Sequence, residues 1–122
     1  MKKIGDWKKK KNFVIGIASD HGGFKMKSSI LETFSRRKIN FIDYGPEIFD
    51  AQDDYSDFGA KLGFAVSKGG CDCGILICRS GVGMGIAANR FHNVRAAAAH
   101  SAKIAKASRD HNCSNVIVIP GD

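Results

Sequence analysis

A thiol and a glycine-rich turn stand side by side in this chain of 122 residues. Cys78 ends the apolar run Gly74-Ile75-Leu76-Ile77-Cys78, and the turn Arg79-Ser80-Gly81-Val82-Gly83-Met84-Gly85 follows at once. If the run is a strand and the turn opens a helix, the helix dipole favours a thiolate at Cys78. Such a thiolate is suited to act as a nucleophile or as a proton-abstracting base. From position alone, a buried cysteine that only completes a strand is the more common case.

The turn itself predicts a site for an anion. Backbone N–H groups at the start of a helix point at whatever docks there, and they favour a phosphate or a developing oxyanion. The glycines at 81, 83 and 85 do not match the dinucleotide-binding pattern, and no Gly-Lys-Ser/Thr follows them as in a P-loop. The motif alone therefore does not distinguish between the two kinds of anion.

Two further segments carry groups that suit a polar site. Asp20 and His21 directly follow the first apolar run, at residues 13–18. His111 lies in the segment 108–112, at a predicted helix end before the last strand. A histidine titrates near neutrality and can serve as an acid or a base, although at a helix end it also stabilises the dipole.

The cysteines predict thiols rather than a metal site. Cys71, Cys73 and Cys78 form no CxxC pair, and no second pair follows. The start of the chain does not have the pattern of a secretory signal, and no apolar run approaches the roughly 20 residues of a membrane-spanning helix. We therefore expect a cytoplasmic protein with reduced cysteines and no membrane partner.

The elements that must position these residues alternate along the chain. Short β-rich runs are predicted at 13–18, 39–43, 74–78, 94–99 and 115–119. Helical stripes between them include one that ends near Arg37, one from Tyr55 to Val66, a short one through Asn89 and one at 101–109. This order predicts an α/β fold, a three-layer αβα sandwich with a doubly wound, parallel, five-stranded sheet of the Rossmann-like kind. Ligands of such sheets bind at the carboxyl ends of the strands, where the strand order reverses.

The charge is concentrated at one end. The chain is 43% hydrophobic and 25% charged, with a formal net charge of +7. Six lysines lie within the first twelve residues, and the rest carries 13 basic and 11 acidic side chains. We predict a basic, flexible tail at 1–12 and a single, nearly neutral domain at 13–122. A solvated tail is favoured over a nucleic-acid-binding arm, so no nucleic-acid partner is expected.

Several segments together resemble the ribose-5-phosphate isomerase B family, which is related to allose- and galactose-6-phosphate isomerases. The matching segments follow one another over residues 13–119: Ser19-Asp20-His21-Gly22-Gly23-Phe24-Lys25, Asp54-Tyr55-Ser56-Asp57-Phe58, the run 74–84, Ile86-Ala87-Ala88-Asn89-Arg90, Val94-Arg95-Ala96-Ala97 and Ser108-Arg109-Asp110-His111-Asn112. The resemblance implies a homodimer or a dimer of dimers with sites near the subunit interface. It also implies a sugar-phosphate substrate, and neither a metal nor an organic cofactor.

The resemblance also assigns roles to residues. Cys78 matches the general base, and His111 matches the acid that helps to open the sugar ring. Positions that match substrate-binding residues are Asp20, His21, Tyr55, Arg79, Ser80, Gly81, Val82, Gly83 and Asn112. The implied activity interconverts ribose 5-phosphate and ribulose 5-phosphate through an enediolate, in the pentose phosphate pathway. Alternatives are an isomerase of allose or galactose 6-phosphate, and a phosphosugar-binding module without catalysis.

Two positions depart from the family pattern. Arg79 stands where the family usually has glycine, and Asp122 stands where the family has an arginine that holds the substrate phosphate. The domain is therefore predicted to lack the family's C-terminal segment, which carries further arginines. Because an aspartate repels a phosphate dianion, phosphate binding requires Arg79, Arg109 or a neighbouring subunit to compensate.

Overall fold

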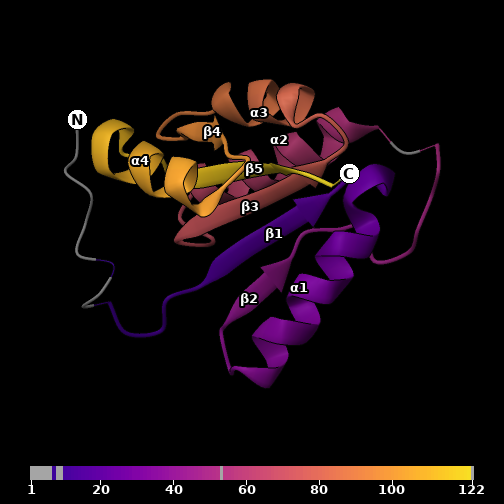
Figure 1. Ribbon diagram of the computed structural model, residues 1–122, viewed down its shortest axis with the longest axis horizontal. Coiled ribbons are helices and arrows are strands. Elements are labelled where there is room, and N and C mark those ends of the chain that lie inside the picture. Colours follow the sequence, from indigo (N-terminus) through magenta and orange to yellow (C-terminus); the bar gives the residue numbers. More distant parts are fainter. Residues whose placement is uncertain (1–6, 8–9, 53, 122) are drawn as a thin grey trace.

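The computed structural model describes residues 7, 10–52 and 54–121, and in these helices and strands alternate (Figure 1). In chain order they are β1 (Ile15–Ser19), the 3-10 helix η2 (His21–Gly23), α1 (Phe24–Arg36), β2 (Phe41–Asp43), α2 (Tyr55–Ser67), β3 (Cys73–Cys78), α3 (Val82–Asn89), β4 (Ala96–Ala98), α4 (Ala102–Asn112) and β5 (Val116–Pro120). All five strands pair in parallel in the order β2-β1-β3-β5-β4. The predicted α/β class and doubly wound sheet are confirmed.

The strand order reverses between β1 and β3. From β1 the chain moves outward to β2, and it then crosses back to β3 on the other side of β1. The register pairs Gly16 with Gly74 and Ser19 with Ile77, so the carboxyl ends of the two strands are level. The reversal therefore lies between the two loops that carry Asp20 and Arg79, where such sheets bind ligands.

Helices cover both faces of the sheet. Leu62 of α2 faces Gly16 and Gly74, since a β-carbon on either glycine would lie 2.8 Å from a Leu62 methyl group. Ile75, which points the opposite way because it adjoins Gly74, lines a hollow together with Ala105 of α4. Figure 1 shows α1 and α4 in front of the sheet and α2 behind it. The three-layer prediction is confirmed.

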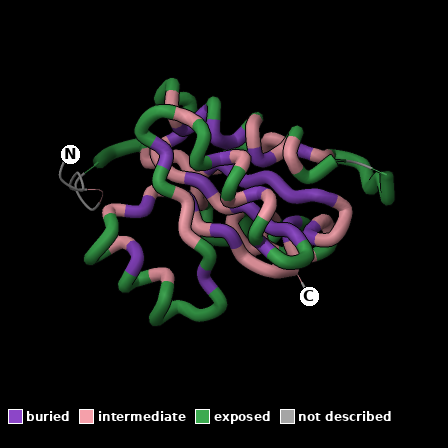
Figure 2. The backbone as a smooth tube through the Cα atoms, turned by 90° about the horizontal axis from the view of Figure 1, so that it is seen from above, coloured by how far each residue is buried: buried purple, intermediate pink, exposed green. Residues whose placement is uncertain are grey.

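The main core lies between the sheet and α2–α3. Leu62, Leu76 and Met84 are fully buried, and Val116 and Val118 are exposed by only 1%. Figure 2 shows the buried backbone running through the middle of the molecule, with exposed segments around it. This core fixes α2 and α3 against the central strands, and thereby the turn at the start of α3.

The alanine-rich segment divides into a strand and a helix as predicted, with shifted ends. β4 starts at Ala96 rather than at 94 because the Arg95 N–H donates to Asn115 Oδ1, at 2.8 Å, instead of to the sheet. Ser101 lies before α4, where its Oγ accepts from the Ile104 N–H. The helix continues past 109 to Asn112 and ends at Cys113, whose φ is +54°.

The described residues of the predicted tail contact the domain. The Trp7 ring lies 5.2 Å from the Phe13 ring, and the Arg109 guanidinium stacks 3.2 Å from the Trp7 ring centre. Lys10 forms an ion pair with Asp72. Residues 1–6 and 8–9 lie outside the described residues, so the flexibility of the tail stays a prediction. No helix in the described ranges is long and apolar enough to cross a membrane.

Leu62→Ala tests the contact between α2 and the two glycines. Truncating this fully buried side chain leaves a cavity, and we expect a loss of about 2–5 kcal/mol in the free energy of unfolding. Urea denaturation measures it. Lys61→Ala, at the neighbouring exposed position of the same helix, should change stability by less than about 0.5 kcal/mol. Equal stability of the two variants would contradict the assigned core.

Candidate active site

Two loops meet at the carboxyl ends of β1 and β3. A β-carbon added to Gly22 would lie 3.3 Å from both the Cβ and the backbone N of Arg79. The Asp20 N–H donates to the Ile77 carbonyl at 3.2 Å, and the Gly121 N–H donates to the Cys78 carbonyl at 2.7 Å. The loops after β1, β3 and β5 thus form one continuous edge.

Cys78 lies in this edge under the turn that opens α3. The thiol is 4% exposed, and its Sγ accepts the Gly81 N–H at 2.9 Å. Gly81 has φ +84°, a left-handed conformation that glycine adopts without strain, and this directs its N–H back toward the sulfur. The Ser80 Oγ in turn accepts from the Val82 N–H at 3.3 Å. The glycine-rich turn is therefore folded around the sulfur.

The expectation that the thiolate of Cys78 is favoured is wrong for this structure. Burial raises the pKa of the Cys78 thiol above its ordinary value, and the nearby charge of Asp20 raises it further. The N–H groups of Gly81, Met84 and Ser80 lower the pKa but offset only part of this effect. Removal from water outweighs the helix start because a buried charge loses more hydration than the N–H groups return. At neutral pH Cys78 is a protonated thiol.

Asp20 and His21 lie beside Cys78 as the sequence predicts. Asp20 is 7% exposed, and its Oδ1 accepts the Gly23 N–H at 3.1 Å, which caps η2. The same residue raises the pKa of Cys78 by its charge, as a close neighbour does. His21 is partly exposed, with its ring edge-on to that of Phe49, 6.4 Å away. Asp20 and His21 therefore form one wall of the candidate site.

Tyr55 contacts the glycine-rich turn that follows Cys78. It begins α2, directly after Asp54, whose side chain accepts the Ser56 N–H at 3.0 Å. A β-carbon on Gly83 would overlap the Tyr55 ring, so this ring packs against Gly83 of the glycine-rich turn. Half of Tyr55 is exposed. The structure thus brings together Cys78, Asp20, His21, Tyr55 and the turn at 79–83.

His111 and Asn112 lie at the other edge of the sheet. His111 is in the last turn of α4, which precedes β5, whereas Cys78 pairs with Pro120 at the far end of β5. β5 alone spans about 13 Å between the two edges. In Figure 1 α4 lies over the tail of β5, away from the strand arrowheads. His111 therefore cannot reach Cys78 of the same chain.

Arg79 and Arg109, the two arginines proposed to hold the substrate phosphate, also lie apart. Arg79 is exposed at the edge that carries Cys78. Arg109 lies near the start of β5, where it donates to the Ser114 carbonyl at 2.8 Å and stacks on Trp7. Of these two arginines, Arg79 alone lies where it can bind a phosphate at the Cys78 edge of the same chain. Asp122, which stands where the family has a phosphate-binding arginine, lies outside the described residues.

Polar ligands for a metal do not gather here. No group of three or more His, Cys, Asp or Glu side chains suited to a metal ion occurs in the ranges 10–52 and 54–121. All four cysteines are free. Burial is the largest of the effects that raise the pKa of Cys73, to about 12, so this thiol is inert.

Residues 48–49 were not expected near the site. Ile48 and Phe49 follow β2 in an acidic stretch and are exposed by 81% and 53%. The Phe49 ring contacts both His21 and Phe24, whose ring centre is 5.8 Å away. In the sequence, the only sign of this contact was that two apolar residues, Ile48 and Phe49, occur in a stretch predicted to be a solvated loop.

Two bacterial proteins are similar in sequence to most of this chain. The chain is 38% identical over 103 residues to ribose-5-phosphate isomerase B of Escherichia coli, covering 84% of this chain and 68% of the relative. A Bacillus subtilis relative, YwlF, is 39% identical over 105 residues, covering 86% of this chain and 70% of the relative. YwlF carries only the general name of a sugar phosphate isomerase.

Solved structures agree in fold. Ribose-5-phosphate isomerase B of Mycoplasma genitalium, solved with bound ribulose-5-phosphate, superposes with a TM-score of 0.85 at 41% identity. The match covers 92% of this chain and 74% of that one. The enzyme of Clostridium thermocellum gives a TM-score of 0.82 at 42% identity, covering 86% and 70%. The pattern of the ribose/galactose isomerase family matches residues 15–122, and the chain belongs to this family of sugar-phosphate isomerases.

Proposed function

We propose that this protein interconverts ribose 5-phosphate and ribulose 5-phosphate, with Cys78 as the base. The observation that carries the proposal is the buried Cys78 sulfur under the N–H groups of the α3 turn, beside Asp20 and His21. The bound ribulose-5-phosphate in a relative of 41% identity supports a five-carbon substrate.

The chemistry needs one base that gives its proton back. A Cys78 thiolate takes the proton from C2 of the open-chain aldose, and the electrons move to the carbonyl to form an enediolate. The thiol then returns the proton to C1, while the C2 hydroxyl proton passes to O1. The ketose and the thiolate result, so no electron acceptor or donor is required.

The same N–H groups serve the sulfur and the substrate in turn. The N–H groups of Gly81, Met84 and Ser80 stabilise the thiolate before the reaction. As the proton moves to sulfur, the negative charge passes to the enediolate oxygen, and the N–H groups of Ser80 and Gly81 become free to stabilise it. A fixed set of donors thus follows the charge without rearrangement of the turn.

We assign ring opening to His111 of a second copy of the chain. His111 is exposed at the edge opposite Cys78, so a homodimer in which these edges face each other completes both sites. Asn112 would enter the site beside it. Arg79 at the Cys78 edge would supply a cation for the phosphate, in place of the arginine that Asp122 replaces.

Cys78→Ala tests the proposed base. Incubation with ribose 5-phosphate, followed by ketose formation, should show activity for the wild type and a loss of about 10²–10⁴-fold for the variant. Cys113→Ala, at a partly buried cysteine on the other edge, should keep full activity. Full activity of Cys78→Ala would show that Cys78 is not the base.

Two further outcomes would change the proposed function. Calorimetric binding of the sugar phosphate without turnover by the wild type would favour a non-catalytic binding module. Faster turnover of allose or galactose 6-phosphate would change the assigned substrate.

The pH dependence of kcat/KM tests whether the Cys78 thiol is the base. Because burial and Asp20 raise the pKa of Cys78, the reactive thiolate is a minor species at neutral pH in the free enzyme. Its fraction grows as pH rises, so kcat/KM should increase steadily from about pH 7 into the ordinary thiol range and beyond. A plateau that begins near neutrality would show that a different group with a lower pKa is the base.

Mixing two inactive variants tests the shared site. A dimer of one Cys78→Ala chain and one His111→Ala chain contains one complete site and one doubly defective site. Random exchange of equal amounts should restore about a quarter of wild-type activity, since half of the dimers carry half of the sites. Absence of any recovery, with mixed dimers confirmed by mass spectrometry, would show that Cys78 and His111 of different chains do not form one site.

A further inference from the structure

The most deeply buried charge in the described chain belongs to a residue outside the proposed chemistry. Lys27 of α1 is 1% exposed, less than Asp20 at 7%. Removal of an ammonium group from water costs several kcal/mol unless its partners compensate. An apolar side chain of similar size would fill this space without that cost, so the partners of Lys27 indicate what the charge contributes.

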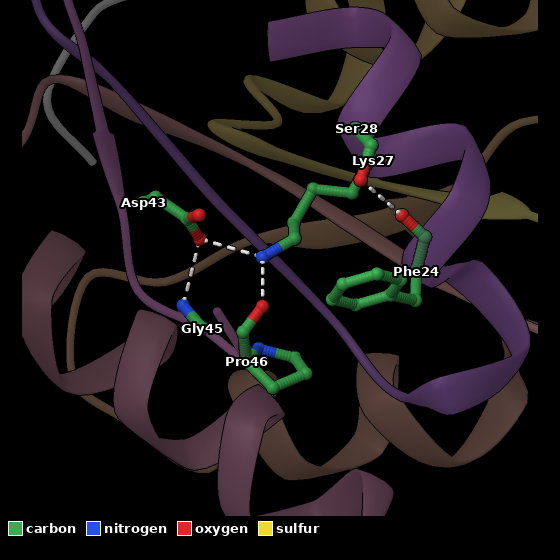
Figure 3. Close-up of polar contacts among 6 residues, drawn as sticks. All are labelled: Phe24, Lys27, Ser28, Asp43, Gly45 and Pro46. Carbon is green, nitrogen blue, oxygen red and sulfur yellow. Dashed lines mark hydrogen bonds and ion pairs between the residues drawn. The ribbon is translucent and has the colours of Figure 1, made fainter. Parts of the chain in front are cut away.

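Those partners lie at the end of β2 (Figure 3). Lys27 Nζ donates to Asp43 Oδ1 at 2.8 Å and to the Pro46 carbonyl at 2.5 Å. The Phe24 ring centre lies 5.6 Å from the same nitrogen, a favourable position for a cation. Asp43 Oδ1 also accepts the Gly45 N–H at 2.8 Å. We call Lys27, Asp43 and the turn 43–46 the Lys27 clamp.

The clamp contacts the candidate site by two routes. On one side the Gly45 carbonyl accepts the Ser19 N–H at 3.0 Å, directly before Asp20. On the other side the chain continues from Pro46 to Phe49, whose ring lies against His21 and Phe24. Both routes end at the loop after β1, and neither involves Cys78. A shift of the clamp would therefore move the substrate-binding groups directly, and would act on the proposed base indirectly, through Asp20.

We propose that Lys27 is a positioning residue that fixes the substrate-binding wall formed by Asp20, His21 and Phe49. This rests on the proposed sugar-phosphate site. A short, directional hydrogen bond holds the Pro46 carbonyl, and the ion pair holds the Asp43 carboxylate; an apolar side chain supplies neither. Lys27 therefore acts on substrate binding through the position of the turn, without touching substrate.

Lys27→Met tests this role, with Lys25→Met as the control because Lys25 is exposed on the same helix. We expect Lys27→Met to raise KM for ribose 5-phosphate about tenfold and to change kcat by less than about threefold. The control should change neither KM nor kcat.

Asp43→Asn provides a second variant in case Lys27→Met fails to fold. It keeps an acceptor for the Gly45 N–H and removes the charge of the Asp43 carboxylate. Together the two substitutions should raise KM less than the product of their separate effects.

Amide hydrogen exchange provides a readout that does not depend on activity. In Lys27→Met, or in Asp43→Asn, exchange should become faster in peptides 19–24 and 43–52 and stay unchanged in 102–112. Unchanged exchange in the first two peptides would overturn the clamp. Faster exchange with an unchanged KM would overturn its role in substrate binding. Should the wild type lack isomerase activity altogether, calorimetric affinity for the sugar phosphate replaces KM, so failure of the proposed function is seen separately.

Discussion

The position of Leu62 between two paired glycines is the contact on which the remaining architecture depends. Gly16 and Gly74 face each other in the register of β1 and β3, and any side chain there would overlap Leu62. The absence of side chains lets α2 lie close to the two central strands. The register that pairs these two glycines also makes the carboxyl ends of the strands level, which brings the loop that carries Asp20 and the end of β3 at Cys78 to one edge. A packing constraint in the core thus determines where chemistry is possible.

At that edge, burial and hydrogen bonding act on the Cys78 sulfur in opposite directions. Loss of water raises the thiol pKa, and the N–H groups at the start of α3 lower it. Cys78 must therefore lose its proton before it acts as the proposed base; a thiolate of raised pKa is a strong base, but it is a minor species at neutral pH. The buried location that disfavours the thiolate also keeps water away from an enediolate.

The two groups to which we assign the chemistry, Cys78 and His111, lie at opposite edges of the sheet. Parallel strands place every strand end at one edge and every strand start at the other, so His111 and Cys78 are separated by the length of β5. In the proposed homodimer a second copy supplies His111, and a twofold axis supplies it to both sites. The buried Lys27 and its partners belong to the edge with Cys78, where they tie β2 to the loop after β1.

Local patterns in the sequence predicted the fold class and the part of the candidate site that lies at the carboxyl ends of β1 and β3. The alternation of short apolar runs and helical stripes predicted the parallel sheet, because periodicity reflects burial one element at a time. Asp20, Cys78 and the turn at 79–83 were predicted together because each lies at, or directly after, the carboxyl end of a strand. The protonation of Cys78, the distance of His111 and the buried ion pair of Lys27 with Asp43 were decided only by the tertiary structure. Each of these depends on desolvation or on contacts between residues distant in sequence, and no local pattern records those quantities.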